Sequence, residues 1–277
     1  PGDAPTIYDL ICGDLLSSGA DCSRGLAWYI SGSEEAFVEL MNIRANELGM
    51  TGTRYENPDG YHSEGHYTTA YDLARLAAYA LNNDDFRTAA RSESAVLYYG
   101  NEPYRRTITN HNKLLKSYDG LIGVKTGFTK KSGRCLVTAA ERDGKRIVAV
   151  TLNDKNDWED HKNLLDYGFS KLVTTKIQTI SSIDVSVVGG KKDKIKIEIP
   201  NTTVNTVGEK EITYKISAES FIYAPVQKGE KVATLKIYAD NKLLKSVDLK
   251  SETAVEAQSY TQYQKFKSIF LKILNSV

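Results

Sequence analysis

The first 172 residues alternate between helix-like and strand-like patterns of apolar positions. Apolar side chains that recur at helical spacing predict helices over residues 6–30, 33–49, 69–81 and 157–172. Ser17-Ser18-Gly19 interrupts the first of these, and Asp21 is expected to begin the helix that follows. Ser33 and Gly49 are suited to begin and end the second.

Three apolar runs without helical spacing lie between the last two helices, at residues 122–126, 135–140 and 146–152. Asp143-Gly144 separates two of them and is a strong hairpin signal. We therefore expect three neighbouring antiparallel strands. Helices that flank such a sheet give an α+β fold for residues 1–174.

From residue 175 the apolar positions alternate over short segments that are separated by turn residues, as in Ile195, Ile197 and Ile199. This pattern predicts a small all-β domain over residues 175–253. The domain contains no His or Cys and no concentrated polar cluster. We therefore expect it to act as a spacer or interaction module.

Residues 254–277 end in apolar positions spaced as on one face of a helix, with lysines on the other faces and two tyrosines just upstream. An amphipathic helix of this composition suits the surface of a membrane, and we expect it to serve as an anchor there. The alternative is a terminal helix that docks on the protein itself.

Charge and composition exclude some functions. The net charge of +1 gives no basic field for nucleic acid. Residues 175–277 nevertheless carry a net charge of +5, which suits an anionic surface such as a membrane or cell wall, although a solvated surface also explains it. Three cysteines without short spacing indicate neither a disulfide framework nor a zinc site, and we expect no metal and no cofactor.

The ends of the sequence give further expectations. No run of 18 apolar residues is present, so no transmembrane helix is expected. The chain opens on Pro1-Gly2-Asp3-Ala4-Pro5, without an initiator Met or a signal peptide, and is interpreted as a fragment that lacks its upstream part.

The tripeptide Lys125-Thr126-Gly127 offers a cation, a small hydroxyl and a glycine that lets a ligand backbone approach closely. By itself it is a weak signal. It stands, however, in a series of five blocks that follow one another along the chain: Leu15–Asp21, Ile30–Asn42, Glu47–Gly60, Gly65–Ala74 and Gly123–Thr129.

These blocks, in this order, closely resemble the D-alanyl-D-alanine carboxypeptidases, which are low-molecular-mass penicillin-binding proteins. The resemblance covers residues 1 to about 172, and the β domain and the tail look like the C-terminal domain and membrane anchor of that family. It implies a penicillin-binding, β-lactamase-like transpeptidase domain that is N-terminally incomplete. It also implies cleavage of D-Ala-D-Ala ends of peptidoglycan stem peptides through an acyl-enzyme, inhibition by β-lactams, and a place in the bacterial cell envelope.

The family's second and third motifs map onto named residues. Ser18 matches the first residue of a Ser-x-Asn motif, whose hydroxyl shuttles protons, and Lys125 is the cation of the Lys-Thr-Gly motif. Thr126 and Gly127 are expected to bind the substrate, and the backbone N–H of Phe128 is expected to help stabilise the oxyanion. Ala20 departs from the pattern, because it stands where the family has the Asn that holds the substrate amide.

The first motif, Ser-x-x-Lys, is absent, since no serine of the chain has a lysine three residues on. The resemblance implies that it lies upstream of residue 1 and that residues 1–277 alone do not turn over substrate. Two alternatives stay open. One is a non-catalytic homologue that binds cell wall or a partner. The other is a class A β-lactamase, against which the appended β domain argues.

Three other residues are candidates for the site. His66 and His111 have the chemistry of a general base, although His66 is more simply explained by ordering its Gly- and Tyr-rich loop. Arg134 can help to bind a carboxylate. Ser18 itself has a plainer explanation, as the cap of the helix that follows it.

Overall fold

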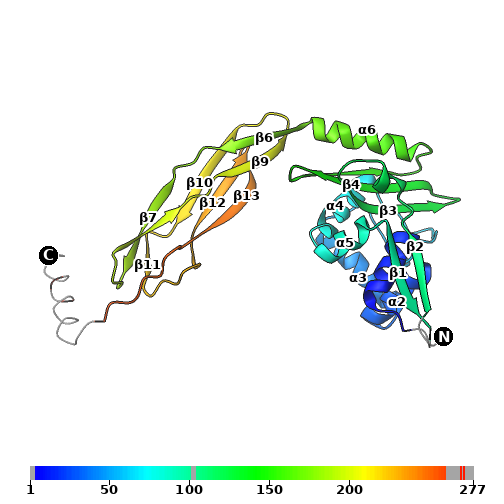
Figure 1. Cartoon of the computed structure of the whole chain (residues 1–277), viewed down its shortest axis with the longest axis horizontal. Coiled ribbons are helices and arrows are strands. Elements are labelled where there is room, and N and C mark those ends of the chain that lie inside the picture. Colours follow the sequence, from blue (N-terminus) through cyan, green and yellow to red (C-terminus); the bar gives the residue numbers. More distant parts are fainter. Residues whose placement is uncertain (1–3, 101–103, 260–268, 270, 272–277) are drawn as a thin grey trace. The chain divides into compact units, whose positions relative to one another are not determined.

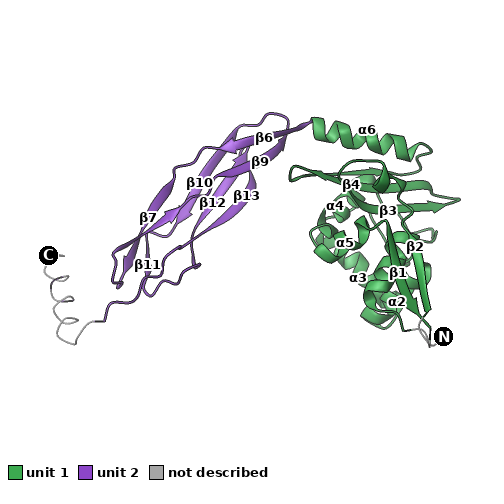
Figure 2. Cartoon of the chain, viewed as in Figure 1, with its two compact units in different colours: residues 1–170 green, residues 171–277 purple. Residues whose placement is uncertain are grey.

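The computed structural model describes residues 4–100, 104–259, 269 and 271 of the 277-residue chain. Contacts divide the chain into two compact units, Pro1–Ser170 and Lys171–Val277 (Figure 2). The sequence places the domain boundaries at residues 174 and 253, and these boundaries remain predictions.

Three helices open the first unit, α1 Ile7–Ser17, α2 Ala20–Ser31 and α3 Glu34–Glu47. Ser33 caps α3 through a hydrogen bond from the N–H of Ala36, as predicted. The expectation that Asp21 begins α2 was wrong. The helix starts after Gly19, so Asp21 already lies in its first turn, where its carboxylate accepts from the N–H of Cys22.

The predicted sheet is confirmed as three antiparallel strands in the order β3-β4-β5: β3 Leu121–Thr129, β4 Gly133–Arg142 and β5 Lys145–Thr151. Asp143 and Gly144 both take positive φ, as the tight hairpin between β4 and β5 requires. Helix α6 Asp157–Ser170 packs on one face of the sheet, and α4 Ala70–Ala80 and α5 Asp84–Arg91 pack on the other (Figure 1). Since β3 pairs only with β4 among the described strands, its second edge is open.

A separate hairpin, β1 Ser94–Tyr99 and β2 Tyr104–Thr109, stands beside α1 and outside the main sheet (Figure 1). One of its faces is apolar, and Ile108 on that face is buried against Cys12 and Leu16 of α1. The short 3-10 helix η1 Lys113–Lys116 follows and leads back to β3. This connection brings the end of β2 close to the end of α1.

The second unit is an all-β domain, as predicted, and its strands form sheets of two or three strands. Ile195, Ile197 and Leu235 are among its fully buried side chains, so the alternating pattern does mark the core. Val255 and Ala257 still form bridges with Val226 and Gly190, so the domain continues to residue 257. The strands are β6 Leu172–Ile177, β7 Ser182–Val188, β8 Lys194–Glu198, β9 Thr202–Val207, β10 Ile212–Ala218, β11 Phe221–Tyr223, β12 Lys231–Ala239 and β13 Lys242–Lys250.

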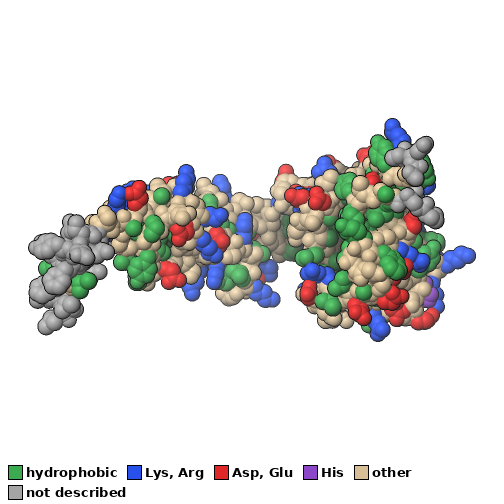
Figure 3. Space-filling model, turned by 90° about the horizontal axis from the view of Figure 1, so that it is seen from below, with side chains coloured by type: hydrophobic (Ala, Val, Ile, Leu, Met, Phe, Trp, Pro, Cys, Tyr) green, Lys and Arg blue, Asp and Glu red, His purple; other side chains and the backbone are tan. Residues whose placement is uncertain are grey.

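The predicted amphipathic tail falls almost wholly on residues 260–268, 270 and 272–277, which lie outside the described residues. Within the described part of the chain, no helix is long and apolar enough to cross a membrane. The Lys and Arg side chains of the second unit are spread over the face that Figure 3 shows, and no single basic patch stands out there.

The three cysteines are free thiols, and Cys12 is buried in the core beside α1. Over residues 4–100 and 104–259, no group of three or more His, Cys, Asp or Glu side chains is arranged to hold a metal ion.

Candidate active site

The structure brings Lys125 and Ser18 together. The ammonium group of Lys125, on β3, donates a hydrogen bond to Oγ of Ser18, in the turn between α1 and α2. It also donates to the carbonyl oxygen of Thr126 at 2.8 Å. Strand β3 and the α1–α2 turn thus form two sides of one site.

Ser18 is held in an unusual backbone conformation. It is the C-cap of α1, with φ 55° and ψ 46° in the left-handed region, and it does not cap α2 as the plainer interpretation proposed. Its N–H donates to the carbonyl of Asp14 at 3.0 Å, and the N–H of Gly19 donates to that of Gly13 at 3.1 Å. A non-glycine residue in this region costs on the order of 1 kcal/mol, and such strain is commonly found at functional sites.

Lys125 carries its charge in a partly buried setting. Burial lowers the pKa of Lys125 below its ordinary value, and the Asp14 carboxylate opposes this shift. Asp14 accepts a 2.6 Å hydrogen bond from the hydroxyl of Ser23, on α2, while burial raises the pKa of Asp14. A desolvated ammonium attracts an anionic ligand more strongly than an ammonium in water does.

Thr126, Gly127 and Phe128 follow Lys125 along β3, the open edge strand. Together with Ser18 they line one cavity of about 570 Å³. A methyl group added at Gly127 would come no closer than 3.8 Å to the Cβ of Cys135, so the fold itself does not require glycine here. The side chain of Phe128 is 70% exposed, although a large aromatic group usually finds cover.

His111 lines the same cavity and is positioned by its neighbours in the chain. Its N–H donates to the carbonyl of Leu16 at 3.0 Å, which ties the end of β2 to α1. Asn110 donates to the carbonyls of Ala90 and Ser92. His111 is therefore held against the turn that contains Ser18, and a residue of the site must lie near this turn.

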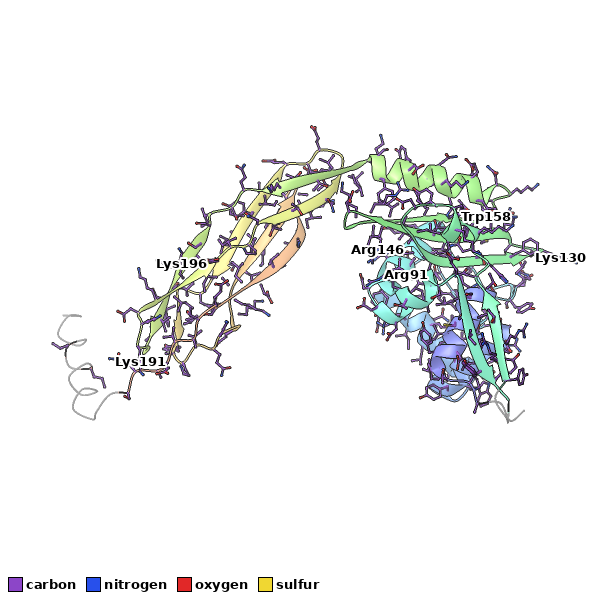
Figure 4. All side chains as sticks on the ribbon, viewed as in Figure 1. Arg91, Lys130, Arg146, Trp158, Lys191 and Lys196 are labelled. Atoms are coloured by element: carbon purple, nitrogen blue, oxygen red, sulfur yellow. The ribbon has the colours of Figure 1, made fainter. Side chains whose placement is uncertain are left out.

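Arg134 reaches the cavity from β4, but its guanidinium already has a partner. Its Nε donates to Asp157 at 3.1 Å, and a second nitrogen donates to the other oxygen of that buried carboxylate. The guanidinium also lies over the ring of Trp158 at 5.5 Å, and Figure 4 shows Trp158 on α6, beside the sheet. This pairing with Asp157 raises the pKa of Arg134.

Ala20 lies in the first turn of α2 and is not among the residues that line the cavity. Its methyl group offers no hydrogen bond. Asn112, next to His111, is 3% exposed, and within the described residues its Nδ2 has no hydrogen-bond partner. Its Oδ1 accepts from the N–H of Leu114 at 3.1 Å.

The two other histidines of interest lie away from the cavity. His66 accepts from the N–H of Glu56 at 3.3 Å and packs edge-on against Tyr55, which agrees with a role in ordering its loop. His161 was not singled out from the sequence. It is fully buried between α6 and the sheet, with hydrogen bonds to the hydroxyls of Thr138 (2.7 Å) and Thr151 (3.0 Å).

Comparisons with known proteins identify the family of the chain. A family model described as D-alanyl-D-alanine carboxypeptidase matches residues 1–156, and a model of the C-terminal domain of penicillin-binding protein 5 matches residues 173–257. The D-alanyl-D-alanine carboxypeptidase DacF of Bacillus subtilis (strain 168) is 32% identical over 253 residues, which cover 88% of this chain and 65% of that protein.

Two further comparisons concern one Streptomyces strain. The D-alanyl-D-alanine carboxypeptidase of Streptomyces sp. (strain K15) is 35% identical over 182 residues, 61% of this chain and 62% of that protein. The crystal structure of the Streptomyces K15 DD-transpeptidase superposes with a TM-score of 0.58 at 31% identity, over 61% of this chain and 70% of that one.

The chain spans slightly less than two thirds of the length of these curated relatives. The first family model nevertheless covers more than half of the chain, and the residues it matches include both β3 and the Ser18 turn. The chain belongs to the D-alanyl-D-alanine carboxypeptidase family.

Proposed function

We propose that the protein containing this chain is a serine-type D-alanyl-D-alanine carboxypeptidase that trims peptidoglycan stem peptides and is acylated by β-lactams. The observation that carries this proposal is the hydrogen bond from Lys125 to Ser18 beside an open edge strand. A cation, a hydroxyl and free backbone groups meet there, as cleavage at a C-terminal carboxylate requires.

In this proposal an extended peptide lies along the open edge of β3. The terminal carboxylate is bound by the hydroxyl of Thr126 and the positive charge of Lys125. The N–H of Phe128 is one of two donors to the oxyanion of the tetrahedral intermediate. Loss of such a donor typically costs about 3–4 kcal/mol of transition-state stabilisation.

The reaction needs a nucleophile, which we place on a Ser-x-x-Lys serine outside residues 1–277. Its oxygen bonds to the carbonyl carbon of the penultimate D-alanine, the C–N bond to the last D-alanine breaks, and the leaving amine takes up a proton. Ser18 can relay that proton, because it lines the cavity and its hydroxyl is hydrogen-bonded to Lys125. Water then cleaves the acyl-enzyme. No step needs a metal ion or cofactor.

The proposed place of action is the bacterial cell envelope, where the substrate is found. We further propose that the amphipathic tail of residues 254–277 attaches the protein to the membrane surface, on the strength of its sequence pattern. Binding to anionic lipid vesicles, lost when residues 260–277 are removed so that the bridges of Val255 and Ala257 stay intact, is the expected result.

Labelling with a fluorescent penicillin tests the catalytic proposal, with the protein made from its complete reading frame. The unchanged protein should be labelled, and Lys125→Ala should reduce the acylation rate by at least about a hundredfold, because an electrostatic contact to the substrate is lost. Lys130→Ala, at an exposed lysine beyond the end of β3, is the matched control and should label normally. Absence of labelling in the unchanged protein would instead favour the non-catalytic, cell-wall-binding homologue.

A further inference from the structure

Two aromatic side chains of the second unit are exposed side by side. Phe221 and Tyr223 lie two residues apart on the short strand β11, so both point to the same face of the sheet β11-β7-β8. Their rings contact edge-on, with centroids 5.4 Å apart. Phe221 is 46% and Tyr223 is 69% exposed, although rings of this size usually find cover. Ile222, between them, packs against the core of the domain instead.

Val188 of β7 extends this apolar area. It is the register partner of Tyr223, so the two side chains lie on the same face of the sheet, and it is 38% exposed. We call Val188, Phe221 and Tyr223 the aromatic face. Apolar side chains that gather on one exposed face commonly mark a surface of interaction, whereas single exposed ones need no explanation.

The aromatic face lies at the end of the second unit from which the described chain leaves, as Figure 1 shows for β11. The N–H of Ala224, directly after β11, donates to the carbonyl of Val188 at 3.0 Å. The next residue, Gly189, accepts from the N–H of Gln258 at 2.8 Å. The segment that leads to residues 260–277 therefore adjoins the aromatic face.

Two lysines border the aromatic face. Lys194 of β8 is the register partner of Ser186, which is itself the register partner of Phe221, so the lysine and the ring lie on one face of the sheet. Lys192 lies in the turn before β8. Within residues 4–100 and 104–259, neither lysine has an ion pair. Asp193 lies between them in the sequence, and two lysines against one carboxylate leave this turn positive.

We propose that the aromatic face is a membrane contact of the β domain. The rings of Phe221 and Tyr223 enter the headgroup region of a lipid bilayer, and Lys192 and Lys194 lie against anionic headgroups. A tyrosine suits this depth, because its ring is apolar while its hydroxyl stays in contact with water. The inference rests on the proposed function for the presence of a membrane at this end of the domain. It adds a second contact, made by folded strands, to the one proposed for the tail.

The chemistry of the aromatic face favours a lipid surface over other partners. Only the hydroxyl of Tyr223 can form a hydrogen bond, so a glycan strand would find few polar partners there. Three side chains also form too small a surface to hold a second protein by themselves. A tail that is bound to a bilayer, however, would keep the aromatic face at a high effective concentration beside the same bilayer, where a small contact is sufficient.

Co-sedimentation with vesicles of phosphatidylglycerol and phosphatidylcholine tests the proposal, with the protein made from its complete reading frame. The unchanged protein should bind, and Phe221→Ser/Tyr223→Ser should bind at least about tenfold more weakly, because two rings are no longer transferred out of water. Lys192→Gln/Lys194→Gln should weaken binding to these vesicles but not to vesicles of phosphatidylcholine alone.

Leu243→Ser/Leu244→Ser is the matched control and should bind like the unchanged protein. It removes two exposed apolar side chains beside the turn between β12 and β13, whereas the chain leaves the domain from the other end of β13. Tyr223→Trp adds a direct readout, since its added fluorescence should be quenched by brominated lipids in the vesicles.

Equal vesicle binding by the unchanged protein and Phe221→Ser/Tyr223→Ser, or unquenched fluorescence in Tyr223→Trp, would overturn the proposal. If that double variant instead lost only self-association or binding to purified peptidoglycan, the aromatic face would have another partner and the proposal would be wrong. Removal of residues 260–277 tests the tail separately. Neither outcome affects the penicillin-labelling test of the catalytic function, so the failures are distinguishable.

Discussion

Lys125 donates a hydrogen bond to Ser18, a residue 107 positions earlier in the chain. The two side chains come from elements of different kinds, an edge strand and the turn that ends a helix. Each is fixed by its own element: Lys125 by the β3–β4 ladder and Ser18 by the capping bonds of α1. The hydrogen bond between them therefore depends on how α1 packs against the sheet.

The left-handed backbone conformation of Ser18 allows its structural role to be tested separately from its chemical role. Ser18→Gly should be more stable than Ser18→Ala by about 1 kcal/mol, because only glycine adopts this conformation without a Cβ penalty. Both variants lose the hydroxyl, so both should lose penicillin labelling in the protein made from the complete reading frame. Chemical denaturation measures the first effect. Equal stability of the two variants would contradict the strain that the backbone angles imply.

Gly127 and Gly123 lie on the same strand but should respond differently to alanine. Gly127→Ala should fold with nearly unchanged stability, because the added methyl meets only ordinary contacts, yet it should weaken the binding of a D-Ala-D-Ala peptide. Gly123→Ala should destabilise the fold, since Gly123 has φ 138° and its Cβ would lie 3.0 Å from Cβ of Ala90. Thermal unfolding and calorimetry give the two readouts. A loss of stability in Gly127→Ala would show that the glycine serves the fold.

His161 should make the first unit sensitive to acid. Burial lowers the pKa of His161 from 6.5 to about 4. Because the unfolded chain binds a proton that the folded chain does not, the contribution to stability is complete above pH 6.5 and is lost as the pH falls toward 4, by on the order of 2 kcal/mol. Denaturation between pH 7 and pH 4 measures this loss. His161→Gln, which does not titrate, should show a flatter profile, and an identical pH dependence in both proteins would exclude His161 as the cause.

Ala20 offers a gain-of-function test. Ala20→Asn should increase the acylation rate by penicillin about tenfold if the new amide reaches the ligand's amide group, as one added hydrogen bond would allow. Ala20→Asp has nearly the same shape without the N–H donor and serves as the control. An unchanged rate in Ala20→Asn would indicate that another group, already present, holds the ligand.

Local patterns in the sequence were sufficient to predict much of this structure. The β3–β4–β5 sheet, the Asp143-Gly144 hairpin and the caps of α3 follow from short-range periodicity and turn chemistry, which depend on neighbouring residues. Lys125 and Ser18 could be paired beforehand because family blocks surround both. The left-handed conformation of Ser18 could not be predicted, since a serine before a glycine suits the start of a helix as well as the end of one.

Long-range packing explains what the sequence did not reveal. The Arg134–Asp157 pair joins β4 to α6 across 23 positions, and no local pattern links the two residues. The burial of His161 could have been predicted from its spacing. It lies three residues after Trp158 and four before Leu165, which places it on the inner face of α6. A polar residue on that face must find hydrogen-bond partners.

The open edge of β3 has a consequence for the solubility of the protein. Unpaired strand edges attract the edges of other molecules, which leads to aggregation unless charge prevents it. Lys125 on this strand, with Lys130 and Lys131 just beyond its end, gives this edge of the sheet a positive charge, which repels the same edge of a second copy. A short peptide that ends in a carboxylate meets attraction where another copy of the protein meets repulsion, so one row of lysines serves both to admit the ligand and to keep the molecules apart.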